Sequence, residues 1–105
     1  MRKGRTAAEK SHLETVAGIG CIVCHRMGNS GVPAEVHHIR AGQGVGQRAS
    51  DYLTIPLCQE HHRTGGQGVA IHAGQRQWES LYGSELDLLA ETISRLRDEW
   101  ARAYL

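Results

Sequence analysis

The sequence contains no phenylalanine, and aromatic residues make up only 5% of its 105 residues. Leu, Ile and Val together number 21, so a purely apolar core would be thin. The chain also lacks an excess of either charge, since 12 Lys and Arg face 11 Asp and Glu. This balance excludes a strongly basic histone-like protein and an acidic tail protein, and it argues against disorder. A small chain with so little core usually needs disulfides, a metal or oligomerisation for stability.

Long apolar runs are absent too. No segment approaches the ~20 apolar residues that cross a membrane, and residues 1–5 are not followed by the apolar stretch of a secretory signal. The 3 cysteines cannot pair evenly, which argues against a disulfide framework. We therefore expect a soluble cytoplasmic protein with no membrane partner, in which reduced thiols and some of the 7 histidines bind metal.

The residue pattern predicts an α+β protein with helices at both ends and a loop-rich middle, since 11 of the 13 glycines lie between positions 18 and 74. Helices are expected over residues 6–17, 73–81 and 84–104, and short strands over 34–39 and 53–57. The segment 40–52 between the strands is too long for a tight turn and is typical of an Ω-loop, which is often functional. We expect a single domain over residues 1–105, with residues 1–10 as a short basic arm.

The last predicted helix carries one apolar stripe, and Ser84 can cap its beginning. The stripe would pack in the core or in a dimer seam, so a dimer through this helix is one expectation. The residues of the stripe are Leu86, Leu89, Ile93, Leu96 and Trp100. The preceding helix, over residues 73–81, is expected to bury Trp78 and Leu81.

Two pairs of candidate metal ligands share the same spacing. Cys21 and Cys24 are separated by two residues, as are Cys58 and His61. This gap lets both side chains of a pair reach one ion around a tight turn, and thiolate and imidazole suit tetrahedral Zn²⁺. The alternative is a redox Cys-x-x-Cys beside an unrelated buried Cys58, but the matching second pair favours structural zinc. Such a closed site explains folding rather than catalysis.

Four further histidines are candidates for chemistry once His61 is assigned to zinc. They are His37, His38, His62 and His72. Neighbours on a strand point to opposite faces, so His37 and His38 could serve a metal and a substrate separately. His62 directly follows a zinc ligand, which would hold it rigidly. The alternative is a set of buried, hydrogen-bonded core histidines, but the placement of His62 favours a second metal site.

Together these motifs resemble the HNH, or ββα-metal, endonucleases. The resemblance is carried by Val36-His37-His38-Ile39-Arg40, the Gly-rich loop, Leu57-Cys58-x-x-His61-His62 and the zinc knuckle Cys21-x-x-Cys24. The stretch from Ala49 to Cys58 and the later His72, Trp78-Glu79 and Tyr82-Gly83 are similar to the phage Ref-like, RecA-dependent nucleases. The similarity covers roughly residues 9–96. It implies a small zinc-stabilised ββα-metal core, with a long loop between two short strands and a helix on each side.

The resemblance implies a metal-dependent endonuclease that hydrolyses DNA phosphodiester bonds. It also implies a phage or prophage origin, a role in recombination in the cytoplasm of a bacterial host, and DNA and a RecA filament as partners. His38 would be the general base, which suits a group that titrates near neutrality. His37 and His62 would bind a catalytic Mg²⁺ or other divalent ion, with His72 as a candidate further ligand.

The middle asparagine of the motif has no obvious counterpart in this sequence. Leu53 occupies the usual offset before Cys58, and Asp51 is the nearest polar residue. We expect Asp51, in place of that asparagine, to orient the loop or His38 through its carboxylate.

Nucleic-acid contacts are expected from arginines near the motif. Arg40 and Arg63 lie beside the motif histidines, and Arg48 lies in the loop between the strands. A guanidinium group suits phosphate oxygens, although each of these residues could equally be ordinary surface charge. The alternative function on the same fold is a non-catalytic, zinc-binding DNA-binding module, which would need zinc but no second metal.

Overall fold

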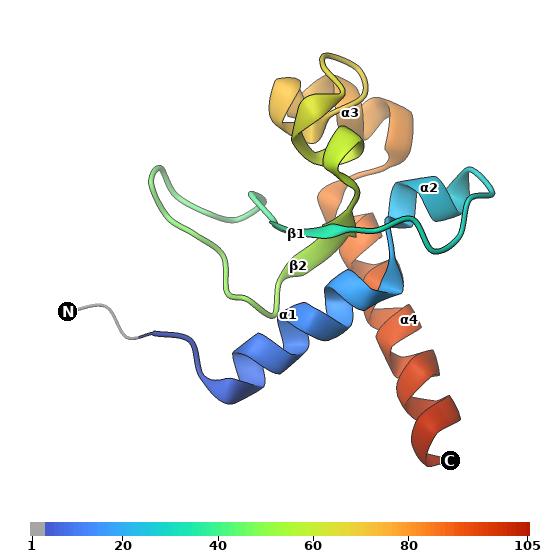
Figure 1. Cartoon of the computed structure of the whole chain (residues 1–105). Coiled ribbons are helices and arrows are strands. Elements are labelled where there is room, and N and C mark those ends of the chain that lie inside the picture. Colours follow the sequence, from blue (N-terminus) through green and yellow to red (C-terminus); the bar gives the residue numbers. More distant parts are fainter. Residues whose placement is uncertain (1–3) are drawn as a thin grey trace.

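The computed structural model describes residues 4–105, in which helices surround a two-stranded sheet (Figure 1). The elements are α1 (Ala7–Ile19), α2 (Ile22–Arg26), β1 (Glu35–His38), β2 (Thr54–Leu57), the π-helical turn η1 (Glu60–Thr64), the 3₁₀ turn η2 (Ile71–Ala73), α3 (Gln75–Tyr82) and α4 (Glu85–Tyr104). The α+β class is confirmed. Residues 1–3 of the predicted basic arm lie outside the described residues, and residues 7–10 form the first turn of α1.

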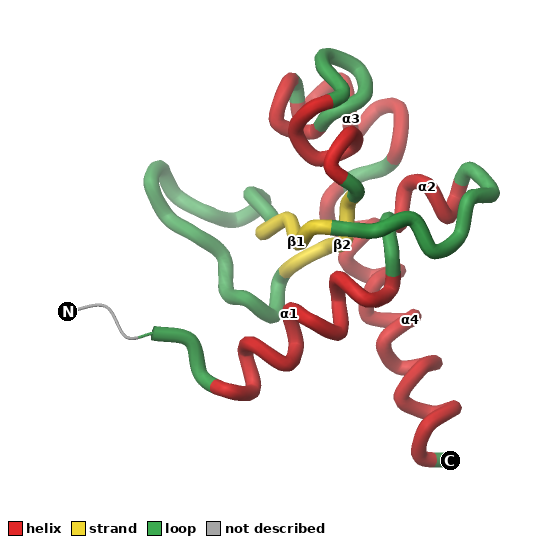
Figure 2. Tube along the Cα trace, viewed as in Figure 1, coloured by secondary structure: helices red, strands yellow, loops and turns green. Residues whose placement is uncertain are grey.

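The sheet is an antiparallel pair in which Glu35 lies opposite Leu57 and His38 lies opposite Thr54. All four residues of β2 are buried, whereas β1 is buried completely only at His37. Figure 2 shows the long connection between the strands as a loop that extends away from the sheet. The histidine pair therefore lies at the end of β1, where this loop begins.

Capping side chains mark the beginnings of α1 and α4, and a glycine marks the end of α1. Thr6 and Glu9 form a reciprocal capping box at the start of α1. Gly20 ends the helix with φ +87°, and a Cβ at this position would lie 3.2 Å from the carbonyl oxygen of Val32. Glycine fits both the left-handed backbone and the close approach. At the other end of the chain, the Ser84 hydroxyl accepts the N–H of Asp87 and caps α4, as predicted.

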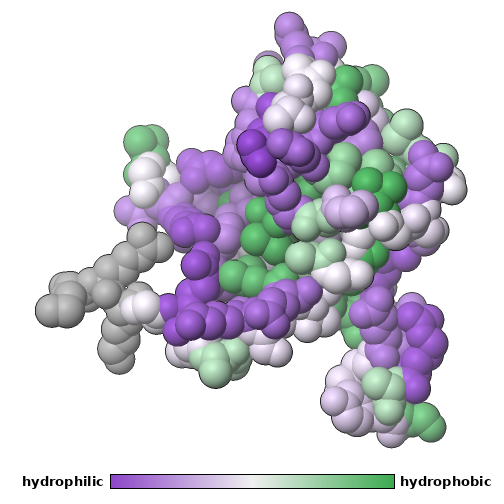
Figure 3. All heavy atoms as spheres, viewed as in Figure 1, coloured by the Kyte–Doolittle hydropathy of each residue, from purple (hydrophilic) through white to green (hydrophobic). Residues whose placement is uncertain are grey.

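The core is small and lies where α1, α4 and β2 meet the segment from Cys21 to Cys24. Its fully buried apolar side chains include Val16, Ile22, Ile55, Leu57, Ile71, Trp78 and Leu88. Figure 3 shows apolar side chains gathered in the middle of one face, with hydrophilic side chains around them. Among the described residues, no helix combines the length and the apolar character that a membrane span requires.

The apolar stripe of α4 is not buried in the core for most of its length, so the first of its two predicted roles is wrong. Leu89 is buried, but Leu86, Ile93 and Trp100 are 57%, 53% and 55% exposed. The buried face is made by Glu85, Leu88, Leu89 and Thr92. These residues lie in the half of α4 that packs on the sheet, whereas the other half extends beyond the body of the molecule (Figure 1). The dimer through this helix stays a prediction.

The predicted burial of α3 is correct for one of its two residues. Trp78 is fully buried, and its Nε1–H donates to the carbonyl oxygen of Val69 at 2.9 Å. Leu81 is 58% exposed, because α3 ends at Tyr82 and the ring of Tyr82 packs on Trp78 instead. This packing holds the loop after η1 against α3.

A pair of glycine substitutions tests the tight turn after η1. A Cβ at Gly65 would clash with Val69 and lie 2.6 Å from the carbonyl oxygen of Glu60, so Gly65→Ala should lower the free energy of unfolding by about 1–3 kcal/mol. Gly18 lies in α1 with open space around it, so Gly18→Ala should raise stability by up to about 1 kcal/mol. Thermal and urea unfolding of both variants would check this, and equal shifts would contradict it.

Candidate functional site

Three cysteines and one histidine from distant parts of the chain come together near the C-terminal end of β2. Cys21 and Cys24 lie at the N-terminus of α2, Cys58 follows β2, and His61 lies in η1. Their four candidate ligand atoms lie within 4.8 Å of one another. The Sγ atoms of Cys24 and Cys58 are 3.8 Å apart, and His61 Nδ1 lies 3.2–3.6 Å from the three sulfur atoms.

These spacings fit a tetrahedral metal ion. Zinc bonds of about 2.3 Å to sulfur and 2.0 Å to nitrogen place tetrahedral ligands about 3.8 Å apart for two sulfurs and about 3.6 Å apart for sulfur and nitrogen. Burial, together with the neighbouring Cys21 and Cys58, raises the pKa of the Cys24 thiol to about 12. This thiol therefore needs a cation to become a thiolate near neutral pH, and the four residues could hold a metal such as zinc.

A second cluster is formed by His37, His62 and His72. His37 lies on β1 and is buried, His62 lies in η1, and the more exposed His72 lies in η2. The Nε2 atoms of His62 and His72 are 2.9 Å apart, and the ring of His37 lies 5.2 Å from both other rings. One ligand atom from each of the three residues lies within 4.8 Å of the others, so these residues could hold a second metal ion.

Two carboxylates orient the rings of this cluster. His37 Nε2 lies 2.6 Å from Glu85, and His62 Nδ1 lies 2.8 Å from Glu35. Each ring thus has one nitrogen occupied and leaves the other available, which is the arrangement that carboxylates impose on histidine ligands of metals. Burial lowers the pKa of His62 and of His72, which favours the neutral imidazole that binds metal.

Glu85 is the most deeply enclosed charged group of the site, with 1% of its surface exposed. Its carboxylate also accepts the backbone N–H groups of Arg40 and Ala41 at 2.8–3.0 Å. Burial alone would raise the pKa of Glu85, but the hydrogen bonds from His37 and from the two amides outweigh it and lower the pKa. The first residue of α4 therefore fixes both His37 and the start of the long loop.

Glu35 is held from two sides. Arg63 donates to its carboxylate at 2.7 Å, and His62 lies against the same carboxylate. These hydrogen bonds, with that from Arg63 the stronger, lower the pKa of Glu35 to about 2. The guanidinium of Arg63, a predicted phosphate contact, is thus paired within the protein.

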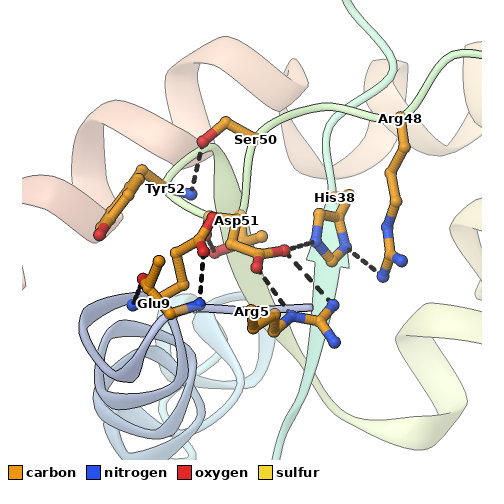
Figure 4. A network of polar contacts seen from close by, with 9 residues as sticks. Arg5, Glu9, His38, Arg48, Ser50, Asp51 and Tyr52 are labelled. Carbon is orange, nitrogen blue, oxygen red and sulfur yellow. Dashed lines mark hydrogen bonds and ion pairs between the residues drawn. The ribbon is translucent and has the colours of Figure 1, made fainter. Parts of the chain in front are cut away.

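His38 belongs to a different network (Figure 4). Its Nε2 lies 2.7 Å from Asp51, and Arg5 donates from Nε to the same carboxylate at 2.7 Å. Arg48 Nη2 lies 3.4 Å from the other ring nitrogen, Nδ1. Because a guanidinium can only donate, this contact requires an unprotonated Nδ1, and the ring proton then lies on Nε2 and is donated to Asp51.

The electrostatics of this network favour a neutral His38. Burial is the largest influence and lowers the pKa of His38, although Asp51 acts in the opposite direction. Asp51 itself has a lowered pKa, first because Arg5 donates to it and second because His38 does. The lone pair of Nδ1 is therefore available near neutral pH, as a proton acceptor requires.

The predicted site residues thus fall into three groups. The four cysteine and histidine residues of the first set lie together, and so do the three histidines of the second. His38, Asp51 and Arg48 form the third, while Arg40 is exposed and donates to the carbonyl oxygen of Gln47. The sequence reasoning missed Arg5, Glu35 and Glu85, because no motif spacing connects them with the histidines that they contact.

Comparison with known proteins gives a family for this arrangement. Residues 5–97 match the model of a family described as "Recombination enhancement, RecA-dependent nuclease". Among curated proteins, the uncharacterized protein YdfU of Escherichia coli (strain K12) is 38% identical over 96 residues. The match covers 89% of this chain and 24% of that relative, so the chain spans about a quarter of the relative's length.

The buried position of Glu85 gives a prediction for Glu85→Gln. The amide would present N–H groups where the carboxylate now accepts from Arg40, Ala41 and His37, so the free energy of unfolding should fall by about 1–3 kcal/mol. Glu91→Gln is the matched control on the same helix, where loss of the more exposed pairs with Arg26 and Arg95 should cost less than about 1 kcal/mol. Urea denaturation would measure both, and an equal loss would contradict the special role of Glu85.

Proposed function

Because the chain belongs to the family of RecA-dependent nucleases of recombination enhancement, we propose that it is a metal-dependent HNH endonuclease that hydrolyses DNA phosphodiester bonds. The observation that carries this proposal is the division of the neighbouring residues His37 and His38. One joins a cluster of three imidazoles that suits a divalent ion, and the other has a carboxylate partner on Nε2 and only the long contact from Arg48 on Nδ1.

In this mechanism His38 is the general base. Asp51 accepts a hydrogen bond from the Nε2–H group of His38. The lone pair on Nδ1 can then take a proton from the attacking water. Asp51 also stabilises the imidazolium that results. Asp51 thereby does the orienting work for which the family motif uses its middle asparagine, and Arg5 keeps its carboxylate ionised.

The second cluster would hold the catalytic divalent ion through His37, His62 and His72. Such an ion supplies positive charge that stabilises the pentacovalent phosphate and the departing 3′ oxygen. Glu85 and Glu35 keep the rings of His37 and His62 turned toward that position. Neutral imidazoles leave the charge of the ion undiminished. The products are a 5′-phosphate and a 3′-hydroxyl.

Zinc is the ion we propose for the site of Cys21, Cys24, Cys58 and His61, with a structural role. The donor set and its spacing support this assignment. We also propose that residues 1–105 act as one nuclease domain, with DNA and a RecA filament as partners. The RecA partner is supported by the family description, which applies to residues 5–97.

The cleavage assay uses plasmid and single-stranded DNA with Mg²⁺ or Mn²⁺, with and without RecA filaments. Wild type should cut in a metal-dependent way, and His38→Ala should fold and bind DNA but cut at least 100-fold more slowly, as loss of a general base usually gives. His25→Gln is the control, because Ser30 is the only side chain in the described part of the molecule that hydrogen-bonds to the ring of His25.

Each outcome separates the candidate functions. Cutting by His38→Ala at the wild-type rate would refute the assignment of the base. No cutting by a folded, metal-loaded wild type under any of these conditions would refute the nuclease and favour the non-catalytic DNA-binding module.

Loss of one ligand tests the zinc site. Cys21→Ser should lose the bound metal and the cooperative thermal transition, because the ion joins α2 to η1 across a thin core. Metal analysis should find one zinc per wild-type chain. A cooperative melt of Cys21→Ser at the wild-type temperature would show that the cluster does not stabilise the fold.

A further inference from the structure

A surface depression of about 550 Å³ borders the network around His38. Its lining comes from the segment before α1, the first turn of α1 and the end of the long loop. The polar side chains in this lining are Arg5, Glu9, Arg48, Ser50 and Asp51 (Figure 4). Two of these residues, Asp51 and Arg48, also contact the ring of His38.

Several hydrogen-bond donors of the lining have no acceptor among the described residues. Arg48 pairs with no carboxylate there, and its contact with His38 is long at 3.4 Å. Arg5 uses Nε and Nη2 for Asp51, which leaves Nη1. The Ser50 oxygen accepts the N–H of Tyr52, so its own hydroxyl hydrogen remains available. Donors that converge without acceptors suit an anion.

The two acidic side chains of the lining, Asp51 and Glu9, differ in how strongly they oppose an anion in the depression. Asp51 is neutralised by Arg5 and by the proton of His38. Among the described residues Glu9 is the acidic residue of the lining without a cationic partner, and its carboxylate accepts the N–H of Thr6 in the capping box. The charge of Glu9 therefore opposes an anion in the depression, whereas that of Arg48 attracts it.

We propose that this depression binds a backbone phosphate of a nucleic-acid strand, with Arg48, Arg5 and Ser50 as donors. The inference rests on the proposed function, because the strand held here is the one whose phosphodiester His38 serves. Arg48 and Ser50 are exposed, so a continuous strand can pass across them. Arg48 both lines the depression and contacts Nδ1 of His38, so it would position the phosphate near the base.

The test is binding of a labelled single-stranded oligonucleotide to the zinc-loaded protein without added divalent ion, followed by fluorescence anisotropy across a range of salt concentrations. Arg48→Gln should weaken binding by about fivefold. It should also reduce the slope of log affinity against log salt by about 0.7, the value for one lost phosphate contact to a single strand. Arg97→Gln is the matched control, on the exposed side of α4.

A second pair of variants tests the same depression with the opposite sign. Glu9→Gln keeps the capping bond, because a glutamine oxygen also accepts the N–H of Thr6. The substitution removes the negative charge of Glu9 and should strengthen binding of the oligonucleotide by about twofold or more. Glu14→Gln on the same helix should leave binding unchanged. An abasic oligonucleotide should show the same effects, because the backbone is the ligand.

The proposal is overturned if Arg48→Gln behaves like Arg97→Gln, if Glu9→Gln behaves like Glu14→Gln, or if wild type binds no oligonucleotide.

Competition with inorganic phosphate tests whether the depression binds the free ion rather than a nucleic-acid backbone. Displacement of the oligonucleotide by phosphate, but not by chloride at equal ionic strength, would assign the depression to the free ion. A wild type that shows these binding effects but never cuts DNA would keep this subsite and refute the nuclease. A cutting enzyme without them would refute only the subsite.

Discussion

The convergence of three thiols and one imidazole is the constraint on which the rest of the structure depends. The four residues come from α2, the end of β2 and η1, so their contact joins segments that the small apolar core leaves weakly connected. With only five residues, α2 is too short to be stable alone. The same contact fixes η1, and η1 carries both His61 and His62. Whatever the second histidine cluster does therefore depends on the first cluster being closed.

Two histidine doublets divide the site into three parts. In η1, His61 turns to the cysteines while His62 turns to the second cluster, because consecutive helical residues point in different directions. On β1, His37 turns to that same cluster and His38 to Asp51, because consecutive strand residues point to opposite faces. Two short sequence doublets thus connect the cysteine–histidine cluster, the three-histidine cluster and the proposed base in one continuous arrangement.

The sequence predicted those parts of the site that have a regular spacing. The repeated two-residue gap identified the four residues of the first cluster. The doublets pointed to His37 and His62 of the second cluster, and the family resemblance added His72. Asp51 was named as the nearest polar residue, with the role of orienting the loop or His38, and its contact with His38 follows from the path of the long loop. Glu85 gave no signal, because an acidic residue in the first turn of a helix is ordinary and nothing local indicates burial. The same anchor rotates the buried face of α4 away from the predicted apolar stripe.

The even charge of the chain does not weigh against the proposed nucleic-acid ligand, because the distribution of charge matters more than its sum. The carboxylates near the histidines are each held by an internal cation or hydrogen-bond donor. The pairs are Glu35 with Arg63, Asp51 with Arg5, and Glu85 with His37. A phosphodiester that approaches His38 therefore meets Asp51 already paired with Arg5. It is opposed by the charge of Glu9 and attracted by the guanidinium of Arg48, which no carboxylate balances among the described residues. A small excess of positive charge is enough when the negative charge nearby is committed to orienting histidines.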